Sequence, residues 1–307
     1  MNNNAHPLCH ICSIPANFLM KKDGFDEYVC PDCNLSFVFP QPDKNWLKEE
    51  VYSYESGYQG NKKSNFEQIK EDKKTKTIIT KLLKLKSKGN LLDVGCSSGE
   101  FMFWAEKRGF SCKGVEVNKR TADIARVNGF DVFGGFLDTA PFKKGEFDII
   151  FLGDVIEHVN DPRNLIKTCK NLLNEKGILV ISTPNMNCFW SHSTFLLYEY
   201  FRIPWSSLTP PYHLFQFSFN NLDKLLLQQG LSIETEFFMK PPRLLYNLGS
   251  LHLLKVFKQK QTIKNLLYMA WAFMLYTLFY TINIVLHPFL KEDFGMVVFY
   301  RKDTDIV

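Results

Sequence analysis

This sequence lacks the features that would place it in a specialised structural class. Its eight cysteines in 307 residues are too few and too scattered for a disulfide scaffold, and no internal repeat is apparent. The amino terminus has no apolar core of the kind found in signal peptides, so we expect a reducing, cytoplasmic setting. A formal net charge of +5 is too small to indicate a nucleic-acid partner. Ordinary fractions of hydrophobic (45%) and charged (22%) residues favour a globular protein.

A glycine-containing turn at residues 90–102 organises the chain. Leu91, Leu92 and Val94 form a short apolar run that is typical of a buried parallel strand, and a predicted helix follows the turn. Ligands of open α/β sheets bind at the carboxyl ends of strands, so we expect a small molecule here. A dinucleotide fingerprint needs the spacing G-x-G-x-x-G, and Ser97 and Glu100 replace its second and third glycines. The dinucleotide interpretation therefore fails.

The spacing Asp93-x-Gly95-x-x-x-Gly99 instead resembles motif I of class I S-adenosylmethionine (SAM) methyltransferases, with Ser97 in place of the common middle glycine. Glu116 ends the next predicted strand, where a carboxylate can accept hydrogen bonds from ribose hydroxyls. A solvated strand-end charge is the alternative for Glu116. The resemblance and the strand ends together assign these candidates to the SAM site: Asp93, Gly95, Gly99, Glu116, Leu137, Asp138, Gly153 and Asp154.

Strands and helices alternate after this turn, which implies right-handed crossovers and a parallel sheet. The resemblance implies more: an α/β fold with a Rossmann-like, seven-stranded methyltransferase sheet at residues 89–307, its last strand antiparallel. The residues themselves predict a small amino-terminal zinc ribbon at 1–42, a helical linker at 43–88, and an apolar helical insert before the last strand.

The ribbon prediction depends on two C-x-x-C pairs. Cys9 and Cys12 form the first pair, and Cys30 and Cys33 form the second. This spacing suits tetrahedral zinc bound by four thiolates, which leaves no open coordination position. We therefore expect a structural zinc that stabilises folding. A redox dithiol is the alternative, but it would not need two matched pairs.

Candidate catalytic residues follow the most apolar predicted strand, at 147–153. The phrase Glu157-His158-Val159 resembles the same phrase in sugar and quinone methyltransferases. Methyl transfer needs in-line positioning and removal of a proton from the acceptor, and a histidine suits that base role. We expect His158 to be the base, with Glu157 orienting it or sharing the task. The alternative is that both residues cap the helix that begins near Pro162.

The aromatic segment 185–219 is predicted to be a lid over the acceptor site. His213 lies in a Pro-x-His-Leu phrase of the sugar-type family and is a candidate acceptor contact, with packing beneath the lid as the alternative. A Pro-Pro-Tyr signature at 210–212 lies after the wrong strand for a nucleic-acid methyltransferase, so we expect no nucleic-acid partner. The resemblance also places Tyr54, in a tyrosine-rich loop, against the substrate pocket.

An uncharged apolar stretch at 266–290 is long enough to cross a membrane. However, the predicted strands on either side of it share a sheet in the family, so a single span would separate them. We therefore expect the stretch to fold back as a hairpin or to lie in the membrane interface, within an apolar insert at 241–291. Upstream lysines favour peripheral contact with an anionic inner membrane surface: Lys255, Lys258, Lys260 and Lys264. Packing on the protein itself, or a dimer interface, is the alternative.

These observations favour a SAM-dependent methyltransferase with a small-molecule acceptor. We expect the acceptor to be a sugar, either free or part of a lipid-linked glycan intermediate. One alternative is a quinone or lipid O-methyltransferase, which an apolar acceptor pocket would favour. Another is a membrane-attached SAM-binding scaffold without turnover. The residues distinguish neither carbon from oxygen methylation nor one oligomeric state from another.

Overall fold

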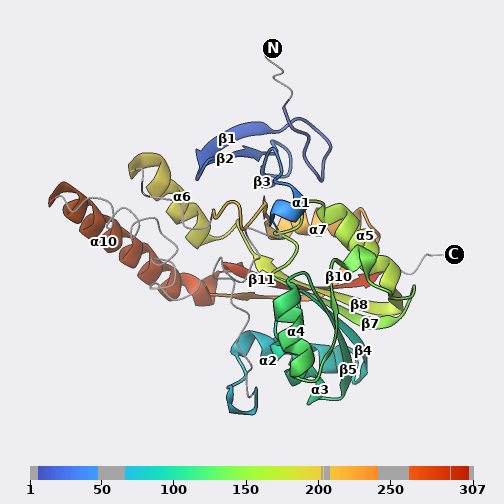
Figure 1. Cartoon of the computed structure of the whole chain (residues 1–307). Helices are drawn as coiled ribbons and strands as arrows, with labels where there is room; N and C mark the ends of the chain where they lie inside the picture. Colours follow the sequence, from blue (N-terminus) through green and yellow to red (C-terminus); the bar gives the residue numbers. More distant parts are fainter. Residues whose placement is uncertain are drawn as a thin grey trace.

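A seven-stranded sheet forms the centre of the computed structural model, which describes residues 6–47, 66–201, 203, 208–240, 263–290 and 292–303 (Figure 1). The strand order is β10-β11-β8-β7-β4-β5-β6. Strands β4 to β8 are parallel, and β11 is antiparallel to both of its neighbours. The predicted Rossmann-like methyltransferase fold is thus confirmed. The bounds are β4 (Gly89–Val94), β5 (Phe110–Glu116), β6 (Asp131–Gly134), β7 (Phe147–Gly153), β8 (Leu173–Pro184), β10 (Leu231–Met239) and β11 (Gly295–Lys302).

Helices cover both faces of this sheet, because its buried strands present apolar side chains to both sides. One hydrophobic core includes α2, α3 and α4, and the other includes α5 and α7. Local caps begin several of these helices; the Asp72 carboxylate, for example, accepts the backbone N–H groups of Lys74 and Thr75 at 2.7 and 3.0 Å. The bounds are α2 (Lys73–Leu85), α3 (Glu100–Glu106), α4 (Lys119–Val127), α5 (Pro162–Leu172) and α7 (Phe219–Leu227).

A second, four-stranded sheet joins two regions that the sequence presents as separate. The ribbon supplies β1 (Asn17–Lys22), β2 (Phe25–Val29) and β3 (Ser36–Val38), and the predicted lid supplies β9 (Phe215–Gln216). Strands β3 and β9 pair antiparallel. The ribbon and the lid are therefore one continuous sheet above the catalytic edge (Figure 1).

The apolar insert differs from its prediction. Within 266–290 the chain forms one continuous helix, α10 (Ile263–Leu286), followed by the short helix η5 (His287–Phe289), so the expected fold-back of this stretch is wrong. The physical reason is that no glycine or proline interrupts the helix before Pro288. Helix α10 packs on α6 (Phe189–Phe201), and both helices project from the same side of the sheet (Figure 1).

Gly99 carries a steric constraint that can be tested. It caps α3 with φ +94°, and a Cβ atom there would come within 2.3 Å of the Phe130 ring. Gly109 has nearly the same φ, +90°, but its Cβ would enter open space. We expect Gly109→Ala to lower the free energy of unfolding by about 1–2 kcal/mol through the left-handed backbone alone. Gly99→Ala should cost a further ~1–3 kcal/mol of overpacking. Urea denaturation of both variants measures the difference, and equal losses would contradict the steric argument.

Candidate active site

The turn between β4 and α3 takes its shape from three residues in the left-handed backbone region. Gly95, Ser97 and Gly99 have φ angles of +74°, +50° and +94°. A Cβ on Gly95 would lie 2.6 Å from the Val155 side chain, so the turn and the loop after β7 approach too closely for a larger residue. Ser97 stands where the family commonly has glycine, and its backbone N–H donates to the Glu116 carboxylate at 3.0 Å.

Glu116 is held in place by the backbone. One carboxylate oxygen accepts the Ser97 N–H, and the other accepts the N–H of Asn118 at 2.8 Å. A carboxylate offers about four acceptor positions, so both oxygens can still bind further donors. Burial raises the pKa of Glu116, although the backbone donors counteract it. Its neighbour Asp93 is also buried, and burial together with the charge of Glu116 raises the pKa of Asp93 to about 8.

A cavity of about 290 Å³ opens at the carboxyl ends of β4, β5, β6 and β7. Of the predicted site residues, six line it: Gly95, Glu116, Leu137, Asp138, Asp154 and His158. Five others lie outside its lining: Asp93, Gly99, Gly153, Glu157 and His213. Gly99 instead faces Phe130, and a Cβ on Gly153 would meet the Phe151 ring at 2.8 Å, so both glycines allow close packing behind the cavity.

Sequence reasoning missed Lys44, which reaches the cavity from the segment after the ribbon. Its ammonium lies 3.2 Å from the Asp138 carboxylate and 3.9 Å from the centre of the Phe136 ring. Leu47 of the same segment also lines the cavity. No local motif marks either residue, because they reach the cavity only through the tertiary fold.

Sequence reasoning also missed Lys74. The ammonium of this α2 residue lies 2.6 Å from the Asp154 carboxylate. The Ser182 hydroxyl donates to Asp154 at 2.7 Å. Burial acts to raise the pKa of Asp154, but the Lys74 charge and the Ser182 hydrogen bond outweigh it and hold the pKa below its ordinary value. The ionised carboxylate remains 51% exposed toward the cavity.

The structure brings three of the four predicted catalytic residues together. Side-chain ligand atoms of Glu157, His158 and His213 lie within 4.8 Å of one another, and the two imidazoles meet edge to face with centroids 4.9 Å apart. His158 Nδ1 is hydrogen-bonded to the Tyr212 carbonyl. The Asp161 side chain caps α5 by accepting the Asn164 N–H, so capping by Glu157 and His158 is excluded. The fourth residue, Tyr54, lies outside the described residues.

Burial favours the uncharged form of each of these three groups. It lowers the pKa of His158, against the opposing influence of the Tyr212 carbonyl and Asp154. The pKa of His213 is lowered to about 3, mainly by burial and to a smaller extent by repulsion from His158. The pKa of Glu157 is raised to about 8, mainly by burial and to a smaller extent by the negative charge of Asp154. At neutral pH both imidazoles are therefore available as proton acceptors.

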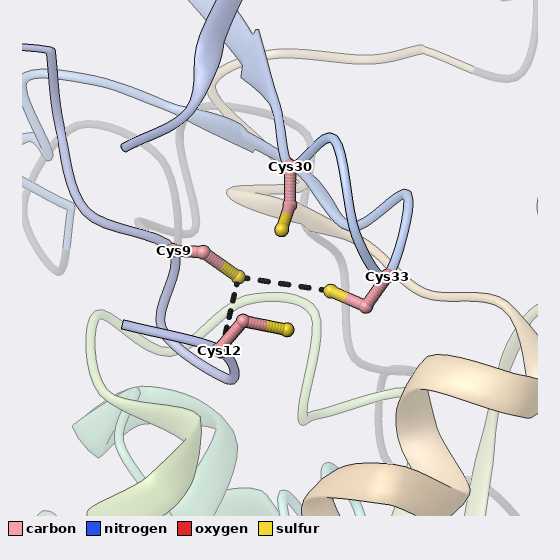
Figure 2. A group of neighbouring side chains, drawn as sticks. All are labelled: Cys9, Cys12, Cys30 and Cys33. Carbon is pink, nitrogen blue, oxygen red and sulfur yellow. Dashed lines mark hydrogen bonds between the residues drawn. The ribbon is translucent and has the colours of Figure 1, made fainter. Parts of the chain in front are cut away.

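The four ribbon cysteines also converge (Figure 2). Their sulfur atoms lie within 4.8 Å of one another, and the Cys9 and Cys33 sulfurs are 3.7 Å apart. Tetrahedral zinc with bonds of ~2.3 Å places its sulfur ligands about 3.8 Å apart. Left-handed residues, Ser13 and Asn34, close the two turns in the same way, each donating its N–H to the carbonyl of the first cysteine of its pair. The donor set and its spacing fit a zinc ion.

Comparison with known proteins agrees with this geometry. The family described as "Methyltransferase domain" matches residues 67–236. The chain belongs to this family. The fold and the family match confirm the expected class I SAM-dependent methyltransferase. The finer expectation, a zinc-ribbon sugar methyltransferase, is taken up below.

Individual relatives match over a shorter region. The ubiquinone biosynthesis O-methyltransferase of Vibrio parahaemolyticus is 28% identical over 104 residues, which are 32% of this chain and 44% of that protein. Uncharacterized protein MJ1123 of Methanocaldococcus jannaschii is 30% identical over 103 residues, which are 33% of this chain and 48% of that protein. The chain thus spans about half the length of these curated relatives. A SAM-dependent methyltransferase structure from Mesorhizobium loti is 15% identical, with a TM-score of 0.47, covering 74% of this chain and 96% of that one.

Glu116 is the predicted ribose acceptor, which makes Glu116→Gln a direct test. Charge-assisted hydrogen bonds contribute ~1.5–3 kcal/mol, so the variant should bind SAM about ten- to a hundredfold more weakly. Calorimetric titration with SAM measures this change. The matched control is Glu175→Gln, which removes the same charge from a side chain that is 94% exposed. Equal SAM affinity in the two variants would remove Glu116 from the cofactor site.

Proposed function

We propose that the protein transfers a methyl group from SAM to a sugar acceptor, with His158 as the general base. The observation that carries this proposal is that His158 lines the same cavity as Gly95 and Glu116. A proton acceptor therefore stands at the edge of the pocket whose other walls suit the cofactor. Because the chain spans only about half of its curated relatives, their names do not decide the acceptor.

The residues around the cavity fit SAM. Glu116 offers carboxylate oxygens to the ribose hydroxyls, the Gly95 turn allows close backbone approach, and Leu137 and Phe136 offer apolar surface to the adenine. When bound, SAM supplies an electrophilic methyl group on a positively charged sulfur. The ionised Asp154, half exposed to the cavity, favours a cation nearby.

His158 is oriented for proton abstraction. The Tyr212 carbonyl can only accept, so the hydrogen bond assigns the proton to Nδ1 and makes Nε2 the basic nitrogen of the neutral ring. Because burial keeps the imidazole neutral at pH 7, Nε2 can accept a proton from the acceptor as the methyl group arrives. His213, edge to face with His158, restricts the ring to this orientation.

Two buried polar side chains, Glu157 and Thr183, support an acceptor with hydroxyl groups; neither lines the cavity, so a hydroxyl would reach them only after a local rearrangement. The two Glu157 oxygens and the Thr183 hydroxyl are buried and have no hydrogen-bond partner among the described residues. The Thr183 hydroxyl is close enough to lower the pKa of Glu157 slightly, but it does not reach hydrogen-bond geometry with it. Buried polar groups without partners cost free energy, and sugar hydroxyls would satisfy them.

Two alternatives remain as proposals of lower rank. A quinone or lipid O-methyltransferase is supported by the relatives named for ubiquinone biosynthesis, over about a third of this chain. The unpartnered polar groups at Glu157 and Thr183 favour the sugar instead. A non-catalytic SAM-binding scaffold would need no oriented base, whereas His158 is held by a backbone carbonyl and packed against a second imidazole.

A structural zinc completes the proposal. Four thiolates would occupy every position of a tetrahedral ion, so its role is to hold the ribbon together. The ribbon supports the lid through the pairing of β3 with β9. The metal would therefore act on catalysis only through the position of the lid.

His158→Ala tests the base assignment. Loss of general-base catalysis should lower the methyl-transfer rate by about 10²–10⁴-fold, while SAM affinity stays within about twofold of wild type. The measurements are transfer of labelled methyl from SAM to membrane and glycan extracts, and calorimetric titration with SAM. His192→Ala, at an exposed histidine of α6, is the control. Normal turnover by the His158 variant would refute the assignment, and SAM binding without transfer in wild type would support the scaffold.

The pH profile provides a second measure of the same assignment. Burial lowers the pKa of His158, and the charged or titratable groups around it are Asp154, Glu157 and His213. Since protonation removes the Nε2 lone pair, kcat should fall as pH decreases through an apparent pKa below the ordinary 6.5. An acid limb at or above 6.5 would contradict the assignment, and the residual activity of His158→Ala should lack this limb.

Cys30→Ser tests the zinc. The variant should lose the metal and unfold at a lower temperature, because metal-binding free energy is folding free energy in such modules. Elemental analysis of the purified protein and calorimetric unfolding measure the two effects. Cys169→Ser is the matched control, since Cys169 is a buried free thiol of α5 outside the cluster. Wild-type protein without zinc, or a Cys30 variant that retains it, would overturn the proposal.

A further inference from the structure

Helices α6 and α10 form one apolar element, which we call the apolar wedge (residues 189–201 and 263–286). Their inner contact is aromatic: the Trp190 ring centroid lies 6.0 Å from that of Tyr276 and 5.8 Å from that of Tyr280. This cluster accounts for the inner faces of the two helices. It does not account for their outer faces.

The outer face of the wedge is apolar as well. Five large apolar residues of α10 recur at helical spacing along one stripe and are between 36% and 65% exposed: Leu267, Trp271, Met274, Leu278 and Val285. Helix α6 adds Leu196, Tyr200 and Phe201 to the exposed apolar surface. Only 17% of the most apolar window of α10 is buried in the protein. A helix that faced water on this side would carry polar residues there.

Hydrogen bonds connect the apolar wedge to the residues that follow β8 and precede β11. The Asn185 N–H donates to the Phe294 carbonyl at 2.5 Å, and the Asn185 amide donates to the Glu292 carboxylate and the Asp293 carbonyl at 3.0 and 3.3 Å. Asn283 of α10 bonds Asp293 at 3.4 Å. Three residues before Asn185, Ser182 holds Asp154 at the cavity. The position of the wedge is therefore coupled to the active site.

We propose that the apolar wedge inserts into a lipid surface and so places the active-site edge beside acceptors that are anchored in that surface. The acceptor part of this proposal rests on the proposed function, whereas the insertion does not. Lipid is favoured over a protein partner because residues 265–290 contain no charged residue, and because the exposed stripe is apolar along the whole helix. Lys255, Lys258 and Lys260 precede the helix in the sequence, Lys264 lies in its first turn, and the four suit the anionic inner surface of a membrane.

The wedge inserts from one side and does not cross the membrane. A 24-residue helix is about 36 Å long, sufficient for a span. However, β10 and β11 flank it and pair in one sheet, so a span by α10 would require a second span between residues 240 and 262. The longest uncharged run in that interval is the 11 residues from Leu244 to Leu254, about half of what a span needs. The helix therefore lies in the interface as an amphipathic or apolar anchor does.

Vesicle flotation of the full-length protein tests the insertion. Wild type should float with phosphatidylcholine vesicles, and more of it with vesicles that also contain phosphatidylglycerol. The double variant Met274→Glu/Leu278→Glu places two charges on the exposed stripe and should reduce the floated fraction by at least about tenfold. The matched control Val127→Glu/Leu227→Glu replaces two equally exposed apolar residues on α4 and α7 and should float like wild type.

Each outcome decides a separate question. Circular dichroism shows that the variants fold, and calorimetric titration reports SAM binding independently of lipid. If the wild-type protein stays at the bottom of the gradient, the insertion is overturned. It is also overturned if the wild-type protein is a dimer by light scattering that does not bind vesicles, and the Met274→Glu/Leu278→Glu variant is a monomer. Wild type that floats and binds SAM but methylates neither free nor lipid-anchored sugars leaves the insertion standing and refutes the proposed function. If the wild-type protein methylates a lipid-anchored sugar faster than the free sugar, and the Met274→Glu/Leu278→Glu variant loses this difference in rate, both the insertion and the proposed function are supported.

Discussion

The backbone carbonyl of Glu157 joins the parts of this protein that the chain keeps far apart. It accepts the N–H groups of Leu214 and Phe215 at 2.8 and 3.1 Å, while the Leu214 carbonyl accepts the Val38 N–H at 3.0 Å. These three hydrogen bonds connect the catalytic loop, the lid and the ribbon in one continuous path. They also place His213, the residue before Leu214, against His158. Together with the β3–β9 pairing, they fix the predicted lid against the ribbon and the loop after β7.

Burial gives the site its electrostatic character. Asp93 and Glu157 both have pKa values raised to about 8 by loss of solvent, and the two imidazoles are held neutral for the same reason. Asp154 is the exception, because Lys74 and Ser182 stabilise its ionised form. The cavity therefore has the ionised Asp154 carboxylate and the neutral His158 imidazole in its wall. This combination suits a reaction in which a positively charged sulfur group reacts beside a hydroxyl that must lose its proton.

The second sheet gives the ribbon a wider role than metal binding. Arg163 of α5 donates to the His10 and Ile11 carbonyls at 3.1 Å, and Asn221 of α7 donates to the Cys33 carbonyl at 3.3 Å. Both cysteine turns thus rest on helices of the methyltransferase sheet. On the other side of the site, the apolar wedge is anchored through Asn185. The ribbon is thus bonded to α5 and α7, and the wedge is bonded to the residue that follows β8.

The sequence alone was sufficient for the fold and for the main features of the cavity. Those features depend on residues close together in the chain: the glycine turn after β4, the carboxylate that ends β5, and the cysteine pairs, whose spacing itself brings two sulfurs together. For 266–290 the topological argument left two outcomes, a fold-back or a place in the membrane interface, and the continuous α10, which no glycine or proline interrupts, rules out the fold-back. Lys44 and Lys74 were also missed, and the β3–β9 pairing was not foreseen. Those features join segments more than 50 residues apart, and only the folded packing of the two sheets decides which of many similar lysines and strands meet.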